Sequence, residues 1–202
     1  MPNEPEEVQR ELKLHFHGPF SFAGGEHSVF ISPVSDRPCI YIWTMKYEGA
    51  NYIHYIGETK KSFLKRQLEH LRNILGMEYG LYDVQKTSTG VLQLIWNGFG
   101  INRNIKKRED LSNTILAAYE SRNAEILEYV RGISIFSAPI YIEDGLRRHL
   151  EGCIGWSLRD NHKEYSSLYP LACRCNKGKM LGKVLYVTCD EPIMGLDEYL
   201  NY

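Results

Sequence analysis

Apolar and polar residues alternate near the start of the chain, and this period of two predicts an extended segment. Leu12, Leu14 and Phe16 recur at every second position within residues 11–22. Successive side chains of a strand point to opposite faces, so these three share one face. We interpret the segment as a strand or an N-terminal arm, and the polar residues 1–9 before it as a frayed tail.

Two apolar runs rich in β-branched and aromatic residues predict an antiparallel hairpin. They cover residues 39–45 and 52–56, and residues 48–51 between them include a glycine. A short glycine-containing spacer is typical of a turn joining two antiparallel strands. Further strands are predicted over residues 91–96, 133–140 and 183–189.

A helical period follows the hairpin. Thr59 or Ser62 can cap a helix that reaches about Leu75. Its expected apolar stripe consists of Phe63, Leu64, Leu68, Leu71 and Leu75. Other helices are predicted from residue 110 or 112 to 130, with a break near Asn123, over residues 143–158 and, as a short tail, over residues 196–200. This order predicts an α+β fold: a small antiparallel sheet with the hairpin, flanked by helices, with inserted and terminal elaborations.

The composition indicates a folded chain without a strong overall charge. Its 202 residues are 43% hydrophobic, which suffices for a packed core, and the formal net charge is −1. Binding of nucleic acid must therefore depend on local basic patches. The chain has two basic runs, one made of Lys60, Lys61, Lys65, Arg66 and Arg72 and the other of Arg103, Lys106, Lys107 and Arg108. A solvated helix face is an equally good interpretation of each run.

The same composition indicates a cytoplasmic protein without a membrane partner. No apolar run can span a bilayer, and the acidic start lacks the apolar segment of a secretory signal. Five cysteines, an odd number without framework spacing, suggest free thiols in a reducing compartment. Cys173 and Cys175, together with Cys189 and Cys153, could bind zinc, but their spacing is not that of a zinc ribbon or finger, and we interpret them as structural thiols. His15 and His17 share one side of the first strand, and we interpret them as surface residues rather than as a metal site.

Side chains suited to phosphate chemistry gather in and after the hairpin. Tyr41 and Tyr55 lie on its two strands, while Arg66 and His70 are four residues apart and share a helix face. A guanidinium can hold two oxygens of a phosphate. The usual pKa of tyrosine is about 10, so Tyr41 can act as a base only if Arg66 or a metal lowers it, with His70 accepting a hydrogen bond or the proton. Taken singly, the tyrosines are ordinary sheet aromatics and Arg66 an ordinary surface residue.

A later helix offers a carboxylate. Glu151 has the donor type that Mg²⁺ prefers, with water and phosphate completing the coordination. Its structural alternative is an ion pair with Arg147 or Arg148. Asn161 closes the segment and either ties the following loop to the site or simply ends the helix.

The order of these residues resembles the pattern of GIY-YIG nucleases. That family has a hairpin with two tripeptides, a helix with arginine and often histidine, then a helix with a metal-binding glutamate, and then an asparagine. The matching residues are Tyr41, Tyr55-Ile56-Gly57, Arg66, His70, Glu151 and Asn161. The match covers residues 38–161 with an insertion at about 77–132, which leaves 1–37 as an N-terminal arm or extension and 162–202 as a C-terminal extension packed on the core. Cys39 replaces the first glycine of the pattern, and the separations from Tyr41 to Tyr55 and from Arg66 to Glu151 are long.

The resemblance implies a hydrolase that cleaves phosphodiester bonds of DNA with Mg²⁺ or Mn²⁺. The resemblance further implies that Glu151 holds the metal, Arg66 stabilises the phosphate and Tyr41 activates water. His70 assists Tyr41, Tyr55 orients or donates a hydrogen bond, and Asn161 completes the catalytic set. Arginine followed by histidine four residues later resembles the restriction-enzyme branch, in which a homodimer would supply two sites for a palindrome.

Two other interpretations stay open at this point. One is a nucleic-acid-binding module on the same fold, with cleavage lost or specialised for branched or damaged DNA. The other is an unrelated α+β interaction protein. If the protein binds DNA, as a nuclease or as a binding module, its lysines and arginines would contact phosphates. Asparagine and arginine side chains between residues 97 and 104 would reach base edges. The predicted DNA contacts are Lys60, Lys61, Lys65, Arg72, Asn102, Arg103, Lys106 and Lys107.

Overall fold

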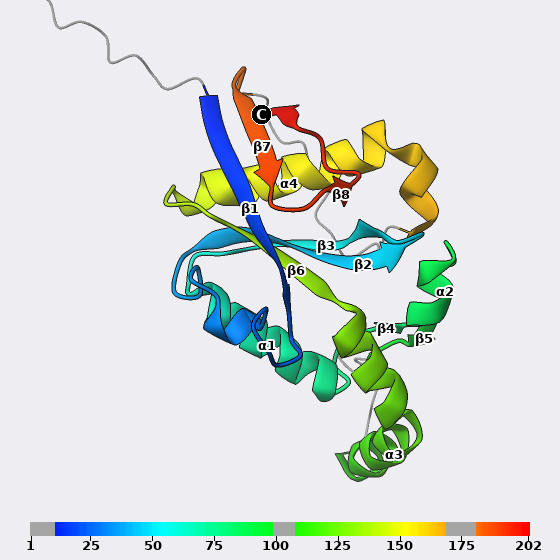
Figure 1. Ribbon diagram of the computed structural model, residues 1–202. Helices are drawn as coiled ribbons and strands as arrows, with labels where there is room; N and C mark the ends of the chain where they lie inside the picture. Colours follow the sequence, from blue (N-terminus) through cyan, green and yellow to red (C-terminus); the bar gives the residue numbers. More distant parts are fainter. Residues whose placement is uncertain (1–10, 99–107, 169–180) are drawn as a thin grey trace, which may run out of the picture.

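The chain folds around one mixed seven-stranded sheet with helices on both faces (Figure 1). The computed structural model describes residues 11–98, 108–168 and 181–202. The strands are β1 (Glu11–Ser21), β2 (Cys39–Tyr47), β3 (Ala50–Thr59), β4 (Leu81–Tyr82), β5 (Leu94–Trp96), β6 (Ser134–Pro139), β7 (Val184–Cys189), β8 (Ile193–Met194) and β9 (Tyr199–Asn201). The helices are α1 (Phe63–Leu75), α2 (Val84–Ser88), α3 (Arg108–Gly132) and α4 (Asp144–Asn161), with short 3-10 turns η1 (Val29–Ile31) and η2 (Lys163–Leu168).

The predicted α+β class is confirmed, but the sheet is larger than the small antiparallel one expected. Its order is β8-β3-β2-β6-β1-β7-β9, with β4 and β5 forming a separate pair. The pairings β1–β7 and β3–β8 are parallel, and the other neighbours are antiparallel. The segment interpreted as a strand or an arm is an internal strand, because Leu14 and Phe16 are buried together with Leu185 and Val187 of β7. Residues near both ends of the chain therefore build the sheet.

The hairpin β2–β3 forms as the sequence predicts, with longer strands. Tyr47 pairs with Ala50, so the turn contains only Glu48 and Gly49, both with positive φ, at 49° and 84°. Such a two-residue turn matches the right-handed twist of the strands it joins. Tyr41 lies opposite Gly57, and this register fixes the position of the candidate site.

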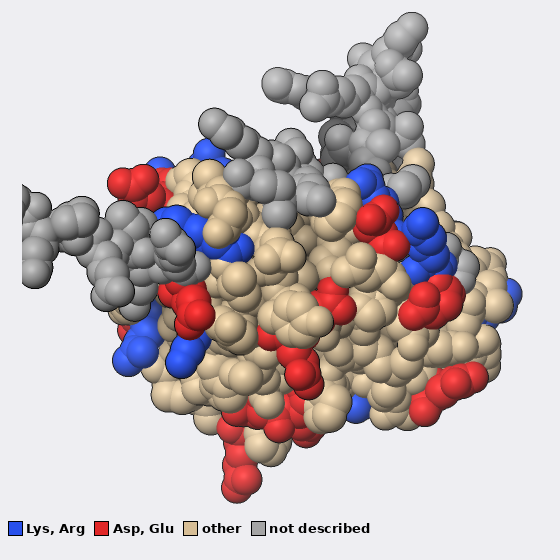
Figure 2. All heavy atoms as spheres, turned by 90° about the horizontal axis from the view of Figure 1, so that it is seen from above, with Lys and Arg blue, Asp and Glu red and all other residues tan. Residues whose placement is uncertain are grey.

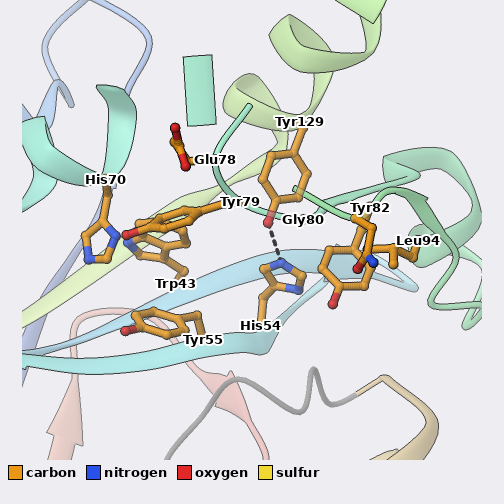
Figure 3. A pocket seen from close by; sticks show the side chains of 11 residues that line it. Trp43, His54, Tyr55, His70, Glu78, Tyr79, Gly80, Tyr82, Leu94 and Tyr129 are labelled. Carbon is orange, nitrogen blue, oxygen red and sulfur yellow. Dashed lines mark hydrogen bonds between the residues drawn. The ribbon is translucent and has the colours of Figure 1, made fainter. Parts of the chain in front are cut away.

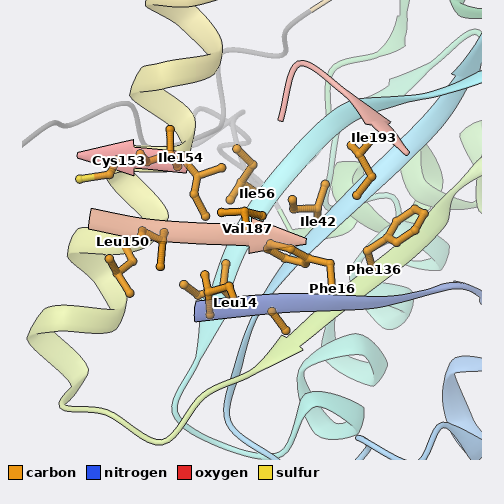
Figure 4. Packing of buried hydrophobic residues seen from close by; sticks show 14 of the residues in the cluster. Leu14, Phe16, Ile42, Ile56, Phe136, Leu150, Cys153, Ile154, Val187 and Ile193 are labelled. Carbon is orange, nitrogen blue, oxygen red and sulfur yellow. The ribbon is translucent and has the colours of Figure 1, made fainter. Parts of the chain in front are cut away.

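The two faces of the sheet are buried in two separate apolar clusters. Ile40 and Ile42 pack with Leu150 and Ile154 of α4 in the first cluster, part of which is seen in Figure 4. Tyr41, Trp43 and Phe63 belong to the second cluster, which lies against α1. Because alternate residues of β2 point to opposite faces and both are covered, the strand reads as one continuous apolar run. Tyr41 thus lies on the α1 side of the sheet, and α4 covers the other side.

The buried face of α1 differs from the expected stripe. Its buried residues are Phe63, Gln67, His70 and Ile74, whereas Leu75 is 38% exposed. Polar partners on the sheet explain the difference. Trp43 Nε1 donates to Gln67 Oε1 at 3.0 Å, and His70 bonds to Tyr41. Ser62 caps the helix as predicted, since its side chain accepts a hydrogen bond from Lys65 N.

Two further helix predictions were wrong. The expected tail helix at residues 196–200 is replaced by β9, because Leu200 pairs with Leu185 and becomes buried in the first cluster. The expected break near Asn123 does not occur, and α3 continues through it. Within the described ranges, the helices are too short or too polar to cross a bilayer.

Candidate active site

The hydroxyl of Tyr41 joins β2 to α1 and is the centre of the site. It lies 2.6 Å from His70 Nε2, and Arg66 Nε donates to it at 3.3 Å. Tyr41 is fully buried and His70 nearly so, whereas the Arg66 side chain is 32% exposed. The structure therefore brings three residues predicted from the sequence into one hydrogen-bonded group, with Arg66 as its solvent-facing member.

Burial controls the protonation of this group. A guanidinium can only donate, so the Tyr41 oxygen accepts from Arg66, while the direction of its bond with His70 Nε2 depends on the imidazole tautomer. Burial, with a smaller contribution from Arg66, lowers the pKa of His70 to about 3. Burial and then Tyr55 raise the pKa of Tyr41 well above its usual value, against the opposing effect of Arg66. The resting site thus contains a neutral phenol and a neutral imidazole.

Gly57 makes room for the Tyr41 ring. A Cβ atom at position 57 would lie 2.4 Å from the Tyr41 hydroxyl oxygen and 2.5 Å from its Cζ. These separations are far below contact distance, so a larger residue would force the ring away from His70 and Arg66. The close packing of the Tyr41 ring therefore explains why position 57 is a glycine.

Replacing Gly57 by alanine is expected to destabilise the protein by about 1–3 kcal/mol, the usual range for overpacking a filled core. The added methyl group displaces the Tyr41 ring from its hydrogen bonds. Urea denaturation measures the loss. Gly145→Ala is the matched control, because a Cβ there meets nothing within 4 Å. Equal stability of the two variants would contradict the packing of Tyr41 on Gly57.

An aromatic cavity lies beside this group (Figure 3). Its volume is about 340 Å³, within the range of small-molecule pockets. Tyr55, the remaining hairpin tyrosine, lines it, with its ring centroid 6.1 Å from that of Tyr41. The other lining residues central to its shape are Trp43, His54, His70, Tyr79 and Tyr129. Of these, only Tyr55 and His70 were among the predicted site residues. The position of Trp43 two residues after Tyr41 was the available signal for a shared face.

Two buried histidines around this cavity make stability sensitive to acid. His54 Nε2 lies 2.8 Å from the Tyr129 hydroxyl, and burial lowers the pKa of His54 to about 4. The unfolded chain, with a usual pKa of about 6.5, binds protons first, so stability falls as pH drops from about 6.5 toward 4. His70 titrates in the same direction, with its lower pKa of about 3.

We expect His54 to contribute a loss of about 2 kcal/mol when pH falls from about 7.5 to about 5. In His54→Gln, stability should depend less steeply on pH over this range. Urea denaturation at each pH measures the difference. His27→Gln, a change at an exposed position, should keep the steeper wild-type dependence. An equally steep dependence in His54→Gln would contradict a buried neutral His54.

Glu151 lies on the other side of the sheet from Tyr41. It is 5% exposed and sits one turn after Arg147 on α4, the helix that packs on Ile40 and Ile42. Tyr55 of β3 packs against both apolar clusters. The structure thus gathers Tyr41, Tyr55, Arg66 and His70, while Glu151 approaches from the opposite face.

Two arginines near Glu151 are engaged with other carboxylates. Arg147 is 2% exposed, with its Nε 2.7 Å from Glu58 Oε2 and its Nη2 2.6 Å from Asp144 Oδ1. Arg148 Nε lies 3.3 Å from Glu58 Oε1. The Glu58 carboxylate, which is neutralised by these two guanidiniums, is therefore a poor cation ligand. Glu151 has the oxygen donors that Mg²⁺ accepts, so a metal would fit there only with water and phosphate as further ligands.

Asn161 ends α4 and holds the C-terminal segment. Its Nδ2 donates to Asp197 Oδ2 and to Ser157 Oγ, each at 2.9 Å, and His162 Nε2 lies 2.8 Å from Asp197 Oδ1. Ten residues separate Asn161 from Glu151, about 15 Å along a helix axis. Its contacts match the structural alternative and do not join it to the Tyr41 group.

Several predicted DNA contacts are accessible. Lys61, Lys65 and Arg72 are exposed, and Lys60 Nζ lies 3.4 Å from Asp144 Oδ2. Seen from above, basic and acidic side chains alternate at the left and right of the view, and acidic side chains gather toward its lower middle (Figure 2). The predicted contacts Asn102, Arg103, Lys106 and Lys107 lie outside the described residues, as do Cys173 and Cys175.

Cys39, which replaces the first glycine of the family pattern, is a core residue. It is fully buried, and burial raises the pKa of its thiol to about 12, against the lowering effect of Ser137. The side chain therefore stays a neutral thiol among apolar neighbours.

Comparison of the chain with protein-family models, with curated proteins and with solved structures finds no match in any of the three.

Proposed function

We propose that this protein is a magnesium-dependent DNA endonuclease that hydrolyses phosphodiester bonds at specific sequences, in the manner of a restriction enzyme. The observation that carries the proposal is the Tyr41 hydroxyl, held between His70 Nε2 and Arg66 Nε. A phenol bonded to a guanidinium and an imidazole fits phosphate chemistry better than it fits a purely apolar core. The order of Tyr41, Arg66 and His70 along the hairpin and helix supports the same family resemblance.

Arg66 is the residue we assign to the scissile phosphate. Its Nη1 lies 2.9 Å from Glu69 Oε2, while its Nε is directed to Tyr41. The Glu69 carboxylate, 45% exposed, occupies the guanidinium in the way that a phosphate oxygen would. A bound phosphate would replace this partner at the surface and bring its negative charge next to the buried phenol.

Glu151 is the residue we assign to Mg²⁺ or Mn²⁺. When bound, such an ion stabilises negative charge on the phosphate and lowers the pKa of coordinated water. Tyr55, which packs against both apolar clusters, would orient the substrate between Arg66 and Glu151. Restriction-type cleavage of both strands would require a second copy of the chain.

A second candidate is a DNA-binding module that does not cleave. The complete burial of Tyr41 and the position of Glu151 behind the sheet favour it. A base must reach its substrate within about 3 Å, directly or through one water. Exposed Lys61, Lys65 and Arg72 would still bind phosphates with a steep dependence on salt.

Incubation of the purified protein with supercoiled plasmid and phage DNA distinguishes these functions. With Mg²⁺ and without EDTA, we expect discrete fragments that Glu151→Ala abolishes. Glu143→Ala, an exposed acid at the start of the same helix, should leave cleavage intact. Intact DNA with salt-dependent binding would favour the binding module, and DNA neither cut nor bound would overturn both.

A further inference from the structure

A second cluster of polar side chains lies far from the candidate active site in the sheet, at the junction of β1 and β7. His15 pairs with Thr188, and Phe16 pairs with Cys189, so Asp190 follows at the level of His17. Phe16 is buried in the core, so His15 and His17, its neighbours on either side, project from the opposite face of β1. One ligand atom from each of His15, His17 and Asp190 can be chosen so that all lie within 4.8 Å of one another.

The carboxylate at the centre of this cluster is held in place. Asp190 Oδ1 lies 2.7 Å from His15 Nε2, and Oδ2 accepts a hydrogen bond from Gly18 N at 3.0 Å. His17 Nδ1 lies 3.7 Å from Oδ2. The backbone N–H of Asp190 donates to Phe16 O at 3.1 Å, which continues the pairing between the two strands beyond β7.

The first histidine is also oriented. His15 Nδ1 lies 2.8 Å from Thr188 Oγ1, so its other ring nitrogen faces Asp190. Metal-binding histidines typically have such a second hydrogen bond, which fixes the ring. The side chains of His15, His17 and Asp190 are 45%, 43% and 45% exposed, so an ion could enter without opening the fold.

We propose that His15, His17 and Asp190 form a binding site for Zn²⁺ or a similar divalent transition metal. Two imidazoles and one carboxylate form a three-residue ligand set that zinc accepts, with water in a fourth position. Imidazole suits zinc, copper, nickel and iron, whereas Mg²⁺ prefers oxygen ligands. This site is therefore separate in place and in chemistry from the magnesium site proposed at Glu151.

Binding of the metal would act as a clamp between distant parts of the chain. The ion would join β1 to the residue that follows β7, because Asp190 lies 173 positions after His17 (190 − 17) and 175 after His15 (190 − 15). A ligand that binds only the folded state stabilises it by an amount that grows with the logarithm of one plus its concentration divided by its dissociation constant. Zinc would thus raise the thermal midpoint of the protein, whether or not the protein cleaves DNA.

Titration of the untagged full chain with Co²⁺ and Zn²⁺, followed by absorption and calorimetry, tests the site. We expect one ion per chain, a Co²⁺ spectrum of nitrogen and oxygen ligation, and no competition from Mg²⁺. His17→Gln should weaken binding by more than about tenfold, since even the loss of an outer-sphere partner typically has that effect. His17 makes the weakest resting contact of the three, so this change leaves the His15–Asp190 pair in place.

His27→Gln is the matched control, because it removes an exposed histidine outside the cluster and should bind the metal as the wild type does. Undiminished binding in His17→Gln would overturn the proposal, as would thiolate-to-cobalt charge-transfer bands. An equal loss in His27→Gln or no binding at all would also overturn it. None of these outcomes depends on DNA cleavage, so the nuclease proposal stands or falls separately.

Discussion

Replacement of Arg66 by alanine is expected to lower DNA cleavage by about a hundredfold to a thousandfold, the usual effect of removing one donor that stabilises transition-state charge. Arg66 is the member of the Tyr41 group that reaches solvent, and its guanidinium already bonds both the phenol and a carboxylate. Initial rates of plasmid cleavage at saturating Mg²⁺ measure the effect. Because the side chain is partly exposed, circular dichroism and urea denaturation should show an intact fold.

Two further variants make this prediction specific. Lys65→Ala removes the exposed neighbouring cation and should change cleavage little beyond a weaker DNA affinity, which is most evident at low salt. Arg66→Lys keeps the charge but loses the planar fork that binds Tyr41 and phosphate together, so it should remain strongly impaired. Full activity in Arg66→Lys would show that only charge matters, and full activity in Arg66→Ala would remove Arg66 from the mechanism.

Replacement of Arg147 by alanine is expected to destabilise the fold by about 3–5 kcal/mol, as for other buried ion pairs that lose one partner. Arg147 is almost completely buried and bonds Glu58 on β3 as well as Asp144 on its own helix. Its loss leaves the Glu58 carboxylate, itself only 15% exposed, with Arg148 alone. The free energy of unfolding in urea measures this loss.

The neighbouring arginine supplies the control. Arg148 also contacts Glu58, but it is 54% exposed, and Arg148→Ala should cost no more than about 1 kcal/mol. Replacing Arg147 by methionine together with Glu58 by leucine should recover much of the lost stability, because no charge is then left buried. Equal losses in Arg147→Ala and Arg148→Ala would contradict the central role of the buried guanidinium.

The local elements of the fold could be predicted because their signals are contained in short stretches of sequence. The hairpin β2–β3 has two apolar runs around a glycine turn, and α1 has its Ser62 cap. The full sheet could not be predicted in this way. Nothing in residues 11–21 indicates that they pair with residues 184–189, since strand partners so far apart are selected by the packing of Phe16 and Val187 against α4.

The same distinction between local and distant contacts decides which residues of the candidate site could be predicted from the sequence. Tyr41, Arg66 and His70 come from adjacent elements, and their convergence follows from the hairpin register and the helical spacing. The burial of His70 was harder to predict, because the periodic leucines of α1 indicated a different buried face and His70 is a single polar residue. The position of Glu151 depends on which face of the sheet α4 covers, and no local pattern states that.

The position of β1 between β6 and β7 has a consequence for folding on the ribosome. The hairpin, α1 and the Tyr41 group are made from residues 39–75, so they can assemble while the chain is still being synthesised. β1 is made earlier, yet its two neighbours, β6 and β7, emerge late. Until β6 and β7 are synthesised, the backbone N–H and C=O groups of β1 lack these strand partners. Such an open strand edge can pair with other chains. Strands β6 and β7, which are translated later than β1, therefore close off an edge of the nascent protein that is prone to aggregation.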